Sequence, residues 1–293
     1  MVTFLDPSIL IPLVALLGLF IGSFLNVVIV RLPVMMEREW QAEMAEFHAE
    51  ANGGGSSDVR GERFNLIAPR SRCPHCEHAI SVLENIPLVS YLFLRGRCRH
   101  CKAAISVRYP LVELLTAMLS ACVAWRFGFS LMTVGALLIF VWITIALAFI
   151  DFDTRLLPDS LTLPLLWMGL IFNLLTGNVS LEDAVIGAVA GYLFLWSVYW
   201  LFKLATGKEG MGHGDFKLLA AIGAWLGWQM LPLVVVLASV TGALFGISLV
   251  ALKLHRRNTP MPFGPFLAVA GLLALFQGET LNTLLPIFST ALP

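Results

Sequence analysis

The chain has 293 residues, of which 58% are hydrophobic and 13% are charged, and its formal net charge is zero. Because a soluble domain carries about twice that charged fraction, the composition excludes an ordinary soluble protein. The zero net charge gives no indication of a nucleic-acid partner, and we expect none.

Long uncharged runs predict a multi-pass helical membrane protein. The first run, residues 9–30, follows no basic segment and is longer than a signal-peptide core, so we read it as a retained span. The run at 218–252 has 35 residues, too many for one ordinary span. Only helices satisfy their own backbone hydrogen bonds in lipid. The remaining runs of spanning length are 131–150, 160–176, 184–202 and 261–278.

The basic residues set the expected topology. Eleven of the 19 Lys and Arg lie between Arg31 and Arg108, so the ends of that region should face the cytoplasm. Two further crossings are needed: residues 110–125 cross the membrane despite Glu113, and 218–252 breaks near 227–232 into two spans. With these crossings, 18 of the 19 basic residues lie on the cytoplasmic side. We therefore expect about eight transmembrane helices with both termini outside. Arg126 is the exception among the basic residues, and the acidic loop residues expected outside are Glu182, Asp183 and Glu279.

Residues 31–109 form the expected cytoplasmic domain. A charged, helix-prone stretch at 35–50 is followed by "NGGGSSD" at 52–58, which reads as a flexible linker. The division into a first helix (1–30), this domain and a transmembrane core (110–293) follows from that pattern.

Two cysteine pairs in this domain predict a zinc site. Cys73-x-x-Cys76 and Cys98-x-x-Cys101 are separated by 21 residues, which suits a tetrahedral site with four cysteine ligands. Four thiolates leave no open position for substrate, so the zinc should be structural. Redox-active or unliganded thiols are the alternatives. The histidines at 75, 78 and 100 could compete as ligands, although surface histidines are the simpler reading.

Two carboxylates are the candidate catalytic residues. Asp151 directly follows the run 131–150. Asp215, in "GMGHGDFKLL", lies just before the run 218–252, and the topology places both carboxylates at the cytoplasmic face. An ionisable group at that depth in a membrane is a functional candidate. Two carboxylates held close share a proton, so one can take a proton from water while the other donates to a peptide carbonyl.

The neighbouring polar residues have plainer interpretations. Asp153 lies nearer the cytosol and could be solvated or paired with Arg155, whereas Asp159 after Pro158 reads as the N-cap of the next helix. The glycines at 210, 212 and 214 would permit positive φ angles and close backbone approach before Asp215. A flexible turn capped by Asp215 is the alternative there.

The ordered motifs resemble the type IV prepilin peptidases, intramembrane aspartyl proteases of the GxGD class. The matching segments, in family order and around the cysteine pairs, are "GSFLNVVIVRLP", "ENIPLVSYLFLRGRC", "RYPLVELLTA", "IDFDTRLLPD", "GKEGMGHGDFKLL" and "PFGPFLAVAG". The resemblance implies cleavage of basic leader peptides from prepilins and pseudopilins, for pilus or type II secretion assembly, at the cytoplasmic face of the bacterial inner membrane. It assigns the catalytic pair to Asp151 and Asp215.

The resemblance also implies methylation of the new N-terminal residue with S-adenosylmethionine. No motif of a nucleotide-binding fold is present, so the residues do not place the donor site, and the segment 84–96 is only a starting hypothesis. An apolar groove should receive the substrate helix. Acidic residues at 153, 159 and 209 could attract the basic leader, and Lys208 and Lys217 could meet an acidic residue of the substrate.

Two other classes of function remain alternatives. A proton- or ion-coupled transporter also uses intramembrane acids and broken helices, but its acids would be expected near the bilayer midplane. A non-catalytic membrane scaffold would explain the cysteines but not the paired aspartates.

Overall fold

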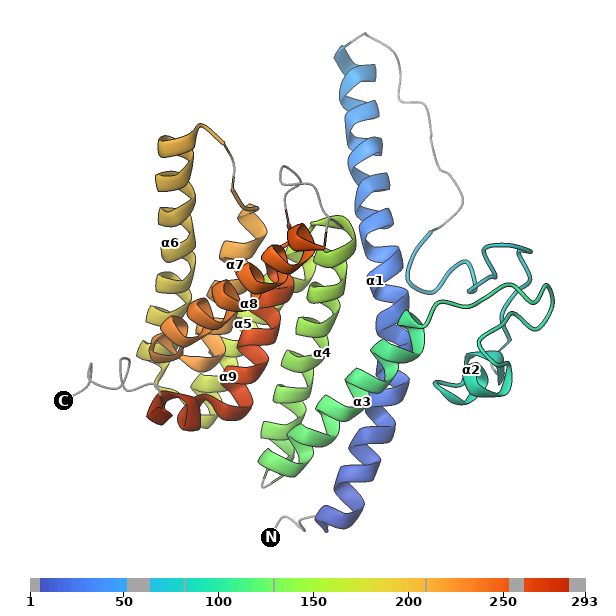
Figure 1. Cartoon of the computed structure of the whole chain (residues 1–293), viewed down its shortest axis with the longest axis horizontal. Helices are drawn as coiled ribbons and strands as arrows, with labels where there is room; N and C mark the ends of the chain where they lie inside the picture. Colours follow the sequence, from blue (N-terminus) through green and yellow to red (C-terminus); the bar gives the residue numbers. More distant parts are fainter. Residues whose placement is uncertain are drawn as a thin grey trace. The chain divides into compact units, whose positions relative to one another are not determined.

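The computed structural model describes residues 6–51, 64–81, 83–128, 130–208, 210–252 and 261–284 (Figure 1). Outside the described residues lie the linker expected at 52–58, Glu209, Lys253, Arg256, Arg257 and the side chain of Glu279.

All regular elements of the described residues are helices. These residues contain no β-strand and only two isolated β-bridges. They form two compact units, Met1–Gly128 (unit 1) and Phe129–Pro293 (unit 2). Unit 1 contains α1 (Pro7–Ala51), a 3-10 turn (Leu83–Asn85), α2 (Val89–Phe93) and α3 (Arg108–Phe127). Unit 2 contains α4 (Leu131–Thr154), α5 (Asp159–Thr176), α6 (Leu181–Thr206), α7 (His213–Leu226), a 3-10 turn (Trp228–Met230), α8 (Leu231–Ala251) and α9 (Gly264–Leu284).

The prediction of an all-α multi-pass membrane protein is confirmed. Six of the described helices are long and apolar enough to cross a membrane, namely α1, α3, α4, α5, α6 and α8. The two other expected crossings correspond to α9, whose apolar part is shorter, and to α7, which has 14 residues. The chain breaks between α7 and α8 at Gly227, where φ is +80°, as the sequence predicts.

Unit 1 is built on the pairing of α1 with α3. α1 continues without interruption from the apolar run into the charged stretch at 35–50, so the sequence boundary at residue 30 lies inside one helix. Two glycines one turn apart on α1 allow the close approach of α3. A Cβ at Gly18 would lie 2.9 Å from Cα of Ala117, and one at Gly22 would lie 2.7 Å from Cα of Glu113. The domain limits expected at 30 and 109 stay a prediction.

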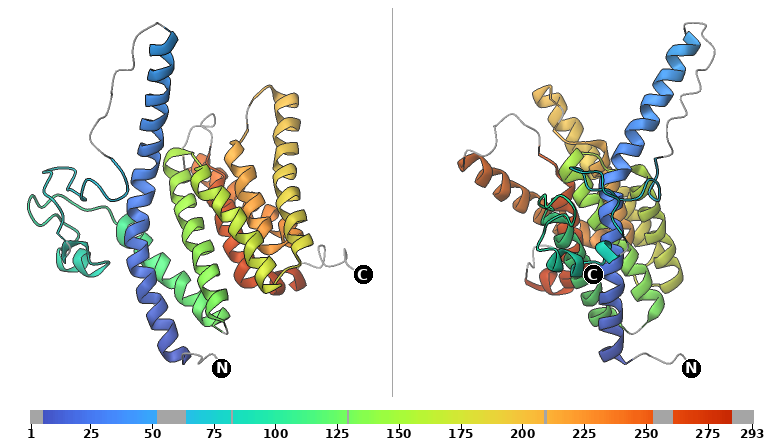
Figure 2. Two further views of the ribbon diagram at one scale, coloured as in Figure 1. Left: turned by 180° about the vertical axis from the view of Figure 1, so that it is seen from behind. Right: turned by 90° about the vertical axis from the view of Figure 1, so that its right-hand side faces the viewer.

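In unit 2, α7 is the central helix, and ten of its residues are buried. Figure 2 shows α4, α5 and α6 as neighbouring helices, with the short α7 next to α6. Small residues set the spacing of α6 and α7. A Cβ at Gly223 would overlap the backbone of Gly187, and a Cβ at Gly191 would lie 2.7 Å from the carbonyl oxygen of Leu219. Such small-residue contacts let membrane helices pack at short distance, which fixes α7 against α6.

The C-terminal end of α7 is held by α5. Trp225 donates its indole N–H to the carbonyl oxygen of Leu165 at 2.8 Å and stacks on Phe172 with ring centroids 5.3 Å apart. The buried amide of Asn173 donates to the carbonyl oxygens of Ala224 and Trp225 at 2.8 and 3.1 Å. The bonds from Asn173 satisfy carbonyl groups that the helix end leaves unpaired, and together with the Trp225 bond they tie the end of α7 to α5.

The contact between α6 and α7 gives a test of this packing. The variant Gly223→Val should lower the thermal unfolding temperature of the detergent-solubilised protein, because a new side chain would have to displace the backbone of α6. The expected loss is at least about 2 kcal/mol of unfolding free energy. Gly135→Val on α4 is the matched control, since a Cβ there meets nothing within 4 Å. Equal behaviour of the two variants would contradict the packing argument.

Candidate functional site

A cavity at one end of unit 2 contains both candidate carboxylates. Its volume is about 140 Å³, and three connections line it: α4 to α5, α6 to α7, and the segment before α9. Lining residues are Asp151, Arg155, Leu157, Gly210, Met211, Gly212, Gly214, Asp215, Met261, Pro262 and Phe263. The structure thus brings together the two aspartates that the sequence places 64 positions apart, together with one cationic side chain.

Asp151 lies in the last turn of α4 and is only 5% exposed. Its Oδ2 accepts a hydrogen bond from the backbone N–H of Gly264, at 2.9 Å. Gly264 is the first residue of α9, where N–H groups have no partner inside the helix. A Cβ on Gly264 would lie 2.7 Å from Oδ2 of Asp151. The absence of a side chain therefore allows the helix end to reach the carboxylate.

Asp215 is the third residue of α7 and is also 5% exposed. Its Oδ1 is buried and has no hydrogen-bond partner within the described part of the chain. Its carboxyl group lies near enough to Asp151 for the two charges to interact. Two such groups cannot both ionise easily, so the pair is suited to holding one shared proton.

The glycines before Asp215 have one of the two expected roles. Gly210, Gly212 and Gly214 are not among the described glycines with positive φ, so that expectation is wrong. Close approach is confirmed at two of them. A Cβ on Gly214 would lie 2.6 Å from the Leu157 side chain, and one on Gly210 would lie 2.8 Å from Phe202. Gly214 therefore lets the start of α7 approach the α4–α5 connection next to Asp151, whereas Gly210 approaches α6.

The interpretation of Asp159 as an N-cap is wrong. The N-cap of α5 is Pro158, and no side-chain cap is present. Asp159 instead lies in the first turn of α5, where the positive end of the helix dipole stabilises its negative charge. Both of its carboxylate oxygens accept hydrogen bonds from Nζ of Lys217 at 2.7 Å. Gly212, not Asp215, is the N-cap of α7. Asp153 is exposed and does not line the cavity.

Unit 1 contains a cluster that could hold a metal ion. The sulfur atoms of Cys73, Cys76, Cys98 and Cys101 all lie within 4.8 Å of one another. Sγ of Cys73 and Sγ of Cys101 are 3.8 Å apart. Four sulfurs around a tetrahedral zinc ion lie about 3.8 Å from each other, whereas a disulfide requires about 2.05 Å. The spacing therefore fits a metal site with four cysteine ligands.

Each cysteine pair lies in the same small turn, a repeat that the motif spacing alone did not reveal. "RCPHCEHAI" at 72–80 and "RCRHCKAAI" at 97–105 align without a gap. In both turns the N–H of the first cysteine bonds to a carbonyl oxygen five residues later, and the residue after the second cysteine has φ near +60°, at 56° and 60°. A direct comparison of the two segments would have found this repeat.

The local backbone favours the thiolate form at one ligand. The N–H groups of His75 and then Cys76 point at the sulfur of Cys73 and lower the pKa of its thiol to about 6. A metal ligand must be deprotonated, so this geometry suits metal binding. The histidines are not members of the cluster; the rings of His78 and His100 stack on each other at 5.2 Å.

Comparisons with known proteins identify two matching family models. "Bacterial Peptidase A24 N-terminal domain" matches residues 16–127, and "Type IV leader peptidase family" matches residues 138–247. Curated proteins named "Prepilin leader peptidase/N-methyltransferase" are similar over nearly the full length of both chains. The protein of Aeromonas salmonicida is 60% identical over 94% of each chain. That of Pseudomonas aeruginosa is 54% identical over 91% of this chain and 90% of its own. No solved structure matches the chain.

The cysteine cluster leads to a metal-binding prediction. The purified protein should contain about one divalent metal ion per chain, because four sulfurs form one closed site. Cys98→Ala should lose most of the metal, measured by plasma mass spectrometry, and should unfold several degrees lower. Cys122→Ala, which removes the cysteine outside the cluster, is the control. A full metal content in Cys98→Ala would rule the site out.

Proposed function

The chain belongs to the type IV leader peptidase family, and on that premise we propose that it cleaves the basic leader peptides of type IV prepilins and pseudopilins. The single observation that supports the chemistry best is the pair of buried carboxylates in one cavity. The names of the relatives favour this function over ion transport.

We assign aspartyl protease roles to Asp151 and Asp215. The N–H of Gly264 stabilises the ionised form of Asp151, so Asp151 is the partner that takes a proton from the attacking water. Asp215 receives no such donor at its buried Oδ1, so we assign it the shared proton, which it donates to the carbonyl oxygen. The water oxygen bonds to the carbonyl carbon, and the peptide C–N bond then breaks as the departing amine takes up a proton.

The proposed location is the bacterial inner membrane, with the cavity facing the cytoplasm and both termini periplasmic. The distribution of Lys and Arg supports this orientation. A cavity formed by the helix connections at one end of unit 2, next to Arg155, is where water could enter. The exposed carboxylate of Asp153 is a proposed contact for a basic leader, and Lys208 for an acidic residue of the substrate. Asp159 and Lys217, also expected to meet the substrate, instead pair with each other at 2.7 Å.

We propose a second activity, methylation of the new N-terminal amine with S-adenosylmethionine, which the names of the relatives support. When bound, this donor supplies a methyl group: the amine forms a C–N bond, the S–C bond breaks with its electron pair going to sulfur, and the amine proton leaves to water. The four-cysteine cluster is proposed to hold structural zinc, since all four ligands come from the protein.

Neutral substitutions in the cavity test the peptidase assignment. Asp151→Asn and Asp215→Asn should each lower the rate of prepilin cleavage by at least about 100-fold, because each removes one proton-transfer group. Purified protein in detergent with a prepilin substrate is the assay. Glu182→Gln, an exposed carboxylate at the start of α6 and outside the cavity, should stay within a few-fold of the wild type. The assignment fails if either cavity variant, correctly folded, cleaves as fast as the wild type.

The bond to Asp151 gives a more specific prediction. Gly264→Ala should lower kcat by roughly 10-fold or more with little change in KM, because the added methyl group pushes the N–H away from the carboxylate. Gly271→Ala on the same helix is the control, since its Cβ would lie 3.0–3.5 Å from the Ile222 side chain and meets neither aspartate. A wild-type kcat in Gly264→Ala would mean that this hydrogen bond does not position Asp151.

A further inference from the structure

The cavity of the two aspartates contains a cationic side chain that the proposed mechanism does not use. Arg155 lines it beside Asp151 and Asp215, and the other lining residues within the described part of the chain carry no charge. They are three glycines and the apolar residues Leu157, Met211, Met261, Pro262 and Phe263. The charge of Arg155 therefore acts on the two aspartates and on whatever binds between them.

The backbone fixes Arg155 one helical turn after Asp151. Arg155 is the C-cap of α4, and its N–H donates to the carbonyl oxygen of Asp151 at 2.8 Å. Its φ of 58° and ψ of 30° lie in the left-handed region, which is unfavourable for a residue that has a side chain. The C-caps of α5 and α6 adopt the same conformation with glycines, Gly177 and Gly207. At the end of α4 an arginine is present despite this strain, which indicates that its side chain has a function.

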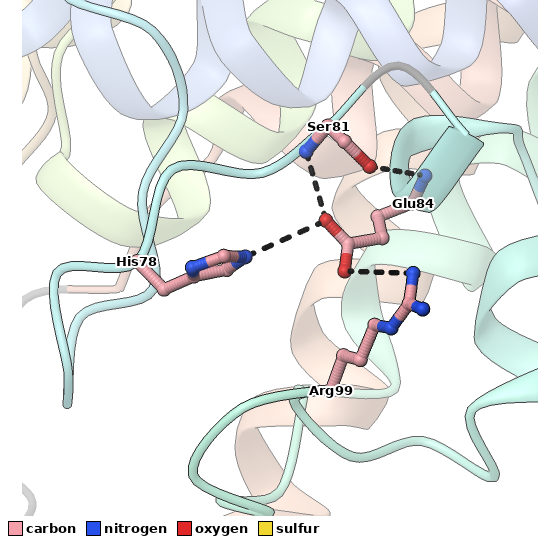
Figure 3. Close-up of polar contacts among 4 residues, drawn as sticks. All are labelled: His78, Ser81, Glu84 and Arg99. Carbon is pink, nitrogen blue, oxygen red and sulfur yellow. Dashed lines mark hydrogen bonds and ion pairs between the residues drawn. The ribbon is translucent and has the colours of Figure 1, made fainter.

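The guanidinium group of Arg155 is available to a ligand. Other cationic side chains have partners in the protein: Lys217 is bonded to a carboxylate of α5, and Figure 3 shows Arg99 of unit 1, which lies 3.9 Å from the carboxylate of Glu84. Arg155 makes no side-chain hydrogen bond or ion pair within the described residues. Its charge lies near enough to Asp151 for the two to interact, but its five N–H donors are not occupied by the protein.

Peptide hydrolysis creates a new negative charge in this cavity. A peptide bond is neutral, and its reaction with water gives a carboxylate on the leader and an ammonium group on the mature chain, with no proton gained or lost overall. The carboxylate forms beside Asp151 and Asp215, each of which is only 5% exposed. Three carboxyl groups in one small cavity repel each other unless a cation lies among them.

We propose that Arg155 forms a subsite for the C-terminal carboxylate that cleavage creates on the leader peptide. This inference rests on the proposed peptidase function. A guanidinium group presents parallel N–H donors that match both oxygens of a carboxylate, so Arg155 can bind the product more tightly than the uncleaved bond. The ammonium group of the mature chain then has Asp151 as its partner. Cleavage therefore exchanges the interaction of Arg155 with Asp151 for two pairs of opposite charge.

A plainer role for Arg155 makes a different prediction. A cation at the C-terminal end of a helix is stabilised by the helix dipole, and Arg155 occupies that position on α4. A charge that served only the helix end would not distinguish between ligands in the cavity. The subsite, by contrast, distinguishes a leader peptide that ends in a carboxylate from one that ends in a neutral amide.

Binding of two synthetic leader peptides to the purified full-length protein in detergent tests the proposal. The peptides share one sequence, and one ends in a free carboxylate whereas the other ends in a carboxamide. By fluorescence anisotropy, the wild type should bind the acid about 10-fold or more tightly than the amide. Arg155→Gln should lose this preference and keep its affinity for the amide, whereas Arg155→Lys should keep part of the preference because it keeps the charge. Arg126→Gln, which removes an exposed cation from the last turn of α3, is the matched control and should keep the full preference.

The wild-type comparison needs no variant, so it does not depend on variant folding. A wild type that binds both peptides equally, or neither, would overturn the subsite. A full preference for the acid in Arg155→Gln would also overturn it and leave Arg155 as a helix-end charge. Prepilin cleavage is measured on the same wild-type sample: cleavage without a preference for the acid refutes the subsite alone, whereas absence of cleavage refutes the peptidase function.

Discussion

Two carboxyl groups are held in one cavity between apolar helices, and the rest of unit 2 is arranged around that unfavourable burial. Moving a carboxylate out of water costs several kcal/mol unless it finds a partner or a proton. Asp151 has a partner in the N–H of Gly264, whereas Oδ1 of Asp215 has none within the described residues. The glycine contacts of α6 with α7 and the bonds of Trp225 keep α7 in place despite this cost.

The sequence predicts the features that depend on composition and spacing. Uncharged runs locate the helices, the break at Gly227 separates α7 from α8, and the four cysteines identify a possible metal site. The pairing of Asp151 with Asp215 follows from the charge topology, because consecutive crossings return the chain to the same face. Family resemblance adds the catalytic assignment, which stays a proposal.

The features that the sequence does not predict depend on distances between segments far apart in the chain. Gly264 reads as an ordinary glycine until its N–H is found 2.9 Å from Asp151, 113 positions away. Asp159 reads as a helix cap because its partner, Lys217, belongs to another helix. A cavity in unit 1 is formed by α1, the cysteine turns and α3, so no single motif marks it.

The proximity of the two aspartates can be measured directly. Asp151→Cys/Asp215→Cys, treated without substrate with a short bifunctional thiol reagent, should give an internal cross-link between these two positions, identified by peptide mass spectrometry. The control pair Asp153→Cys/Asp215→Cys should not, because Asp153 is exposed and lies outside the cavity. Absence of the first cross-link, or equal yields for both pairs, would contradict the claim that α4 and α7 bring one pair of carboxylates to a common site.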